Sequence, residues 1–109
     1  MVKLNAINWH DSPISSLNFD FNKGLLLMKF QEFGTLIHYQ LLATHVLIKK
    51  INLEKGLEVS NCEISDLKSL QINDDLYEIA LQVYSPMNGV VKLKFECSDI
   101  NITEVKLFS

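Results

Sequence analysis

Residues 9–12 read Trp-His-Asp-Ser and form the densest group of chemically capable side chains in the sequence. An adjacent His and Asp suit metal-assisted hydrolysis, and a neighbouring Ser suggests a Ser-His-Asp nucleophile. Metal phosphohydrolases hold such a pair on a helix with further His and Asp ligands, whereas His10 and Asp11 precede an alternating strand. Ser12 has no Gly-flanked nucleophile elbow around it. The surrounding sequence therefore supports neither chemistry.

The remaining chemically capable residues give no site either. His10, His38 and His45 are the only histidines, and their spacing supports no zinc set of three. Cys62 and Cys97 lack a polarised surrounding that would make a reactive thiolate. With four Gly in the chain there is no Gly-rich phosphate loop. We expect no enzyme, no metal and no cofactor.

A structural role is the expectation for Trp9, His10, Asp11 and Ser12, and the same motif is a candidate for contact with a partner. Asp11-Ser12-Pro13 is turn chemistry, in which Asp and Ser accept from backbone N–H groups and Pro fixes φ. We expect Asp11 to cap such groups and His10 to pack beside Trp9. The Trp9 indole should be buried at an edge or end of the sheet.

Composition limits the class of protein. The 109 residues predict a single domain, 1–109, with 48% hydrophobic residues and a net charge of −3. Scattered lysines and an acidic balance disfavour nucleic-acid binding. No apolar run approaches the ~18 residues of a membrane span, and the N-terminal residues contain no apolar run of signal-peptide length, so we expect a cytoplasmic protein. Cys62 and Cys97 then read as buried reduced thiols, with a disulfide as the alternative.

Period-two alternation of apolar and polar residues predicts strands along most of the chain. The cleanest alternating row is Tyr77, Ile79, Leu81 and Val83, and Leu26, Met28 and Phe30 form the inner row of an earlier strand. Ile14 is out of phase with the residues after Ser16, which predicts a bend or bulge between Ile14 and Ser16. Residues 62–72 could hold one helical turn capped by Ser65, but strand is favoured. Turn signals fall at residues 22–24, 33–35, 53–57, 73–75 and 85–89.

Two segments repeat one organisation at an offset of 54 residues. Placing Ala43 over Cys97 sets Thr44 over Ser98 and His45 over Asp99, with an alternating strand on each side. An old duplication would explain this, and so would two strands that each need the same bulge at a sheet corner. We favour the second explanation.

These patterns predict an all-β fold: an antiparallel meander, sandwich or partly open barrel of about seven or eight strands, with at most one short helix. Leu25, Leu27, Leu42 and Leu47 fall out of step with the inner rows. Either a second sheet packs against them, or they form an apolar interface. In the absence of another partner we expect a homodimer.

The opening Trp-His-Asp-Ser-Pro-Ile-Ser-Ser-Leu (residues 9–17) resembles the strand opening of small bacterial domains of unknown function. The nearest named group is the immunity-protein-50-like family linked to polymorphic toxins. Leu-Lys-Phe-Glu-Cys-Ser-Asp-Ile-Asn-Ile (residues 93–102) is similar to the closing strand pair of that family. The resemblance implies a small cytoplasmic protein without enzymatic motifs, and it assigns no catalytic residue.

Three functions follow as expectations. The first is a protein-binding module, such as an immunity protein that neutralises a toxin. The second is a structural or accessory β-domain that associates with itself. The third is binding of a small apolar ligand in a barrel mouth, which the surplus leucines suggest.

Overall fold

The computed structural model describes residues 4–20, 22–52, 62–86 and 89–105, and within them the fold is all-β, as expected. One 3-10 turn precedes the strands. No helix in this part of the chain is long and apolar enough to span a membrane. The elements in chain order are η1 (Leu4–Ala6), β1 (Ser12–Asp20), β2 (Leu25–Gln31), β3 (His38–Thr44), β4 (Leu47–Asn52), β5 (Glu63–Asn73), β6 (Leu76–Ser85), β7 (Gly89–Cys97) and β8 (Asp99–Val105).

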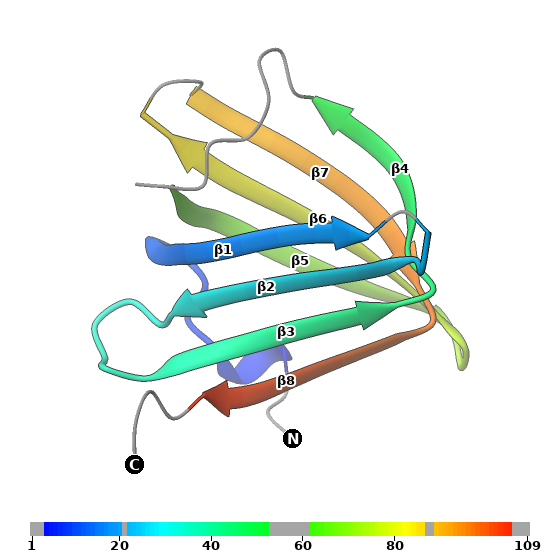
Figure 1. Ribbon diagram of the computed structural model, residues 1–109, viewed down its shortest axis with the longest axis horizontal. Helices are drawn as coiled ribbons and strands as arrows, with labels where there is room; N and C mark the ends of the chain where they lie inside the picture. The colour runs from blue at the N-terminus through cyan, green and yellow to red at the C-terminus, as the bar shows by residue number, and fades with distance from the viewer. Residues whose placement is uncertain (1–3, 21, 53–61, 87–88, 106–109) are drawn as a thin grey trace.

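The eight strands form one antiparallel sheet in the order β4-β7-β6-β5-β1-β2-β3-β8. Figure 1 shows that this sheet is folded over into two layers. One layer holds β1, β2, β3 and β8, and the other holds β5, β6, β7 and β4. Apolar side chains at alternate positions of both layers face each other across the space between them.

The two layers are joined at a corner where two strands turn together. β3 runs into β4 and β7 runs into β8, and the pairing keeps its register through the turn. Three steps from the pair Thr44↔Asp99 lead to the pair Leu47↔Glu96. On the opposite side, the described residues of β1 and β5 pair at Ser12↔Ile64 and Pro13↔Glu63, and the N–H of Ile14 donates to the carbonyl of Cys62 at 3.0 Å. The described strands therefore form a partly open barrel that is continuous at the corner between β3–β4 and β7–β8.

Local backbone chemistry makes the corner. His45 adopts a φ of 53°, in the left-handed region. For a residue with a β-carbon this conformation is unfavourable by on the order of 1 kcal/mol, and it interrupts the regular strand geometry. The next N–H, of Val46, donates to the carbonyl of Gly24 at 2.8 Å, and the N–H of Ser98 donates to the carbonyl of Thr44 at 3.1 Å. Gly24 itself has a φ of 62°, which a glycine adopts without strain.

The two halves of the chain have the same order of strands. β1, β2 and β3–β4 form one meander, and β5, β6 and β7–β8 form another. β1 and β5, the first strands of the two meanders, each have a bulge next to the residues that pair them. The bulge lies between Ile14 and Ser16 in β1 and between Ile64 and Asp66 in β5. Both third strands bend at the corner, where they are paired. Buried rows correspond in the middle strands: Leu26, Met28 and Phe30, and Ile79, Leu81 and Val83.

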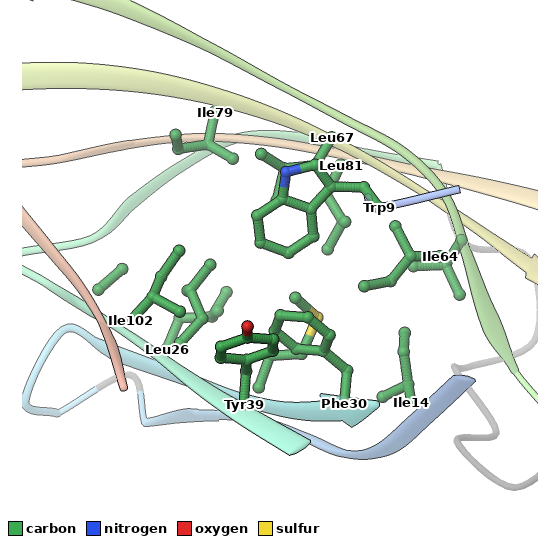
Figure 2. Packing of buried hydrophobic residues seen from close by; sticks show 14 of the residues in the cluster. Trp9, Ile14, Leu26, Phe30, Tyr39, Ile64, Leu67, Ile79, Leu81 and Ile102 are labelled. Atoms are coloured by element: carbon green, nitrogen blue, oxygen red, sulfur yellow. The ribbon is translucent and has the colours of Figure 1, made fainter. Parts of the chain in front are cut away.

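Trp9 fills the space between the layers (Figure 2). Its ring centroid lies 5.0 Å from that of Phe30, which lies 5.7 Å from that of Tyr39. Leu67 and Leu81 of the other layer lie on the opposite side of the indole. Trp9 is thus a central core residue, and the expectation of an edge position was wrong.

Several local predictions are confirmed. The bulge between Ile14 and Ser16 is present, and residues 63–73 are strand throughout, without a helical turn. The turns at 22–24 and at Asp74–Asp75 are where the sequence places them. The predicted turn at 53–57 lies outside the described residues.

Candidate functional site

The turn at residues 8–12 connects the N-terminal segment to both layers. The N–H of Ser12 donates to the carbonyl of Trp9 at 3.2 Å, which closes the turn, and Asp11 takes a φ of 65° within it. The N–H of Asp11 donates to the carbonyl of Ile64 at 2.7 Å. The Trp9 Nε1–H donates to the carbonyl of Leu4 at 2.9 Å. Pre-proline geometry and a left-handed Asp together let the chain enter β1 directly after this tight turn.

Ser12 is fully buried and its hydroxyl joins the turn to a second loop. Ser12 Oγ donates to the carbonyl of Asn8 at 2.8 Å and accepts from the N–H of Phe33 at 3.1 Å. The N–H of Asn8 donates to Oε2 of Glu32 at 2.8 Å. The buried capping group is therefore Ser12. The Asp11 carboxylate, predicted for that role, instead faces His10 with an Oδ2–Nε2 distance of 3.5 Å.

The His10 side chain is 71% exposed, whereas the sequence led us to expect it packed beside Trp9. Its Nδ1 lies 2.9 Å from the carbonyl oxygen of Ser65. A carbonyl only accepts, so Nδ1 carries the proton. This hydrogen bond raises the pKa of His10 above 6.5, and the negative charge of Asp11 raises it further. Glu63 and Asp66 act in the same direction.

The loop between β2 and β3, residues 32–37, is held by a dense set of hydrogen bonds and is called the β2–β3 loop below. The N–H of Glu32 donates to the carbonyl of Ile37 at 3.0 Å, and the N–H of Thr35 donates to the carbonyl of Glu32 at 3.2 Å. Thr35 Oγ1 donates to the same Glu32 carbonyl and accepts from the N–H of Ile37, each at 3.0 Å. Gln31 Nε2 donates to the carbonyl of Thr35 at 2.7 Å. With the Ser12 contact, both ends and the middle of this loop are fixed.

This fixed loop displays two large apolar side chains to solvent. Leu36 is 90% exposed and Phe33 is 53% exposed. Sequence reasoning missed both, because it read Phe33-Gly34-Thr35 only as a turn. The signal was the presence of apolar residues on either side of a Gly in a turn, where polar residues are usual.

Carboxylates surround this end of the molecule. Burial raises the pKa of Tyr39, and the negative charges of Glu32 and Glu104 raise it further, which places both carboxylates near its ring. The ion pairs among the described residues are Lys49–Glu96, Lys68–Asp66, Lys94–Glu78 and His10–Asp11. Within that part of the chain, Glu32 and Glu104 therefore have no lysine partner.

The three histidines lie in different places and form no metal site. His10 is bonded to β5, His38 begins β3 opposite Val105, and His45 is at the corner. No group of three or more potential ligands is present in the part of the chain that the structure describes.

At the corner, one contact was not foreseen from the sequence. His45 Nδ1 lies 2.7 Å from Ser98 Oγ, which also lies 3.4 Å from the carbonyl of Thr44. Among the described residues no carboxylate pairs with His45 to orient its ring, as a catalytic triad requires. The contact fastens the two bent strands to each other.

Both cysteines are buried, and neither is in a disulfide. Burial raises the pKa of the Cys97 thiol to about 11, with a smaller contribution from the charge of Asp99. The reduced state expected from the sequence is the one present, and the alternative of a disulfide is not.

The four surplus leucines lie on outward-facing positions. Leu27 is directly opposite Leu42, and these two and Leu25 are half-buried by their strand neighbours. Only Leu47 is well exposed, at 56%. Among the described residues the most exposed leucine is Leu36, in the β2–β3 loop, outside the predicted set.

Comparison of the sequence with models of known protein families and with curated proteins gave no match. The fold and the contacts described above are therefore what any assignment of function has to rest on.

Proposed function

We propose that this protein is a non-enzymatic binding module of the bacterial cytoplasm that neutralises a protein toxin, and that the β2–β3 loop is its contact surface. The observation that supports this most is the 90% exposure of Leu36 on a loop held by hydrogen bonds at both ends and in its middle. The adjoining outward residues of the Trp9–Ser12 turn, His10 and Asp11, extend the surface. Trp9 and Ser12 are buried and act by supporting it.

The energetic argument concerns what the loop gains on binding. Removing apolar surface from water is favourable by roughly 25 cal/mol per Å². A loop that is already fixed loses little further conformational entropy when it binds, so more of that gain appears as affinity. Phe33 and Leu36 have the size of interface anchor residues, and a pocket on a partner would bury them.

The charge around the loop indicates the chemistry of the partner. Glu32, Glu104 and Asp11 give the rim a negative charge, and a partner with a basic surface would associate faster with it. Toxins that bind or cut nucleic acid have such surfaces. The resemblance of residues 9–17 and 93–102 to immunity proteins points to the same class of partner.

The other two expected functions have less support. An accessory domain without a dedicated partner would leave the exposure of Phe33 and Leu36 without a role. Ligand binding in a barrel mouth was suggested by Leu25, Leu27, Leu42 and Leu47, and all four lie on outward-facing positions.

Co-expression with a toxin encoded beside the gene tests the proposal. The wild-type protein should restore growth and co-purify with the toxin. A Phe33→Ser/Leu36→Ser double variant should lose both properties and keep its β-sheet circular dichroism. A matched variant, Leu47→Ser/Val90→Ser, removes two exposed apolar side chains elsewhere and should behave as wild type. Rescue by the loop variant, or the lack of any toxin beside the gene, would refute the proposal.

A further inference from the structure

Among the residues that the structure describes, the second half of β5 has a paired strand on one side and none on the other. β5 pairs with β6 along its length, but β1 leaves it after the pair Ser12↔Ile64. Beyond the His10 contact at Ser65, no described residue bonds to the other edge of residues 66–73. Every residue from Lys68 to Asn73 is exposed, so this end of the β5–β6 hairpin projects past the core. Such an edge presents unpaired N–H and C=O groups to another strand.

The side chains on this edge are suited to association. Leu70 is 62% exposed and Ile72 is 45% exposed. Lys68 is the only charged residue between Leu67 and Asn73. Exposed strand edges are usually protected by several charges. The outer strand β8 follows that rule with exposed Asp99 and Glu104.

We propose that two copies of this protein associate through the free edges of β5, paired antiparallel about a two-fold axis at Ser69. A two-fold contact places the same surface on both sides, so it must be compatible with itself. With Ser69 opposite Ser69 of the second copy, Lys68 lies opposite Leu70 of that copy. The only charge in the paired stretch then never faces its own counterpart, and the Lys68 methylene groups can cover the leucine.

The contact is short. Its regular part ends at the bulge between Gln71 and Asn73, so it spans about five residues of each copy. An interface well below the usual ~1,600 Å² gives a weak dimer, with a dissociation constant on the order of micromolar or higher. In Figure 1 the β5–β6 tip and the β2–β3 loop lie at opposite ends of the molecule. The dimer would leave the β2–β3 loop of each copy free, and its formation is independent of the proposed toxin binding.

Sedimentation equilibrium between about 10 and 500 µM tests the association directly. Wild type should shift with concentration from 12.5 kDa towards twice that mass. Leu70→Lys should remain monomeric throughout this range. Leu47→Lys introduces the same charge at a similarly exposed leucine on β4 and should dimerise as wild type does. A wild type that stays monomeric, or a dimer that Leu70→Lys leaves intact, would overturn the proposal.

Disulfide cross-linking tests the position of the axis. Facing residues of an antiparallel hydrogen-bonded pair have Cα atoms ~5.5 Å apart, which a disulfide can span. Ser69→Cys should therefore form a disulfide dimer under mild oxidation, since Cys62 and Cys97 are buried. Ser15→Cys, exposed on β1, should not. Equal cross-linking of the two variants would mean that the contact is not at this edge.

Discussion

Ser12 Oγ accepts a hydrogen bond from the N–H of Phe33, 21 residues away, at 3.1 Å, while its own proton goes to the carbonyl of Asn8. One buried hydroxyl thus holds the turn that seats Trp9 and the loop that displays Phe33. Ser12, one of the residues that the sequence marks as chemically capable, therefore supports a loop whose exposed side chains are apolar.

Ser12→Ala should lower the free energy of unfolding by about 1–3 kcal/mol, because it leaves the Phe33 N–H and the Asn8 carbonyl without their partner. Urea denaturation measures this. The control is Ser15→Ala, whose hydroxyl is exposed and donates to the carbonyl of Lys29 at 3.1 Å. That variant should change stability by less than about 0.5 kcal/mol. Equal losses of unfolding free energy in the two variants would mean that the buried Ser12 hydroxyl stabilises the fold no more than the exposed Ser15 hydroxyl does.

Substitutions at Asp11 separate backbone conformation from side-chain capping. The φ of 65° makes Asp11→Ala unfavourable by about 1 kcal/mol, while Asp11→Gly adopts this conformation without strain. The Asp11→Gly protein should therefore be at least as stable as the Asp11→Ala protein, and close to wild type in stability. If the carboxylate were an essential cap, both variants would be destabilised alike. Thermal melts of the three proteins decide between the two roles.

The pKa of His10, measured by NMR titration, should lie above 6.5 because its Nδ1–H donates to the Ser65 carbonyl and Asp11 is adjacent. Asp11→Asn should lower it. A folded-state pKa above the unfolded value favours the protonated imidazole in the fold. The resulting stabilisation is complete below about pH 6.5 and is lost as the pH rises through the folded-state pKa. Stability relative to His10→Ala should fall over that interval, and a rise would contradict the contact.

The Cys97 thiol should be inert in the folded protein. Burial raises its pKa to about 11, so at pH 8 almost none of it is thiolate, the reactive form. A chromogenic disulfide reagent should titrate this cysteine only after urea is added. Rapid labelling of Cys97 in the native state would show that β7 opens locally.

Alternation was enough to predict strands, inner rows and the Ile14–Ser16 bulge, because these depend on neighbours in sequence. It could not predict which strands pair. The contact of β3–β4 with β7–β8 joins residues 40 to 67 positions apart in the sequence, and the period-two pattern says which face is buried but not which strand is adjacent.

The site was less predictable than the fold. Ser12 is among the residues that the sequence marks, but its hydrogen-bond partner Phe33 belongs to a loop that the sequence shows only as a turn. Leu27 and Leu42 lie opposite each other and are half-buried, which a one-dimensional pattern does not reveal. Exposure depends on what the tertiary fold leaves uncovered, and Leu36 is uncovered.

The affinity for the proposed partner, a toxin encoded beside the gene, tests the central claim that the β2–β3 loop is the binding surface. Titration calorimetry measures it. Leu36→Ser should weaken binding by about 30-fold or more, the scale of an interface anchor residue, while Leu47→Ser leaves it within about 2-fold. Both variants should melt near the wild-type temperature, since both leucines are exposed. Unchanged affinity in Leu36→Ser, with a loss in Leu47→Ser, would contradict the account and place the binding surface on β4.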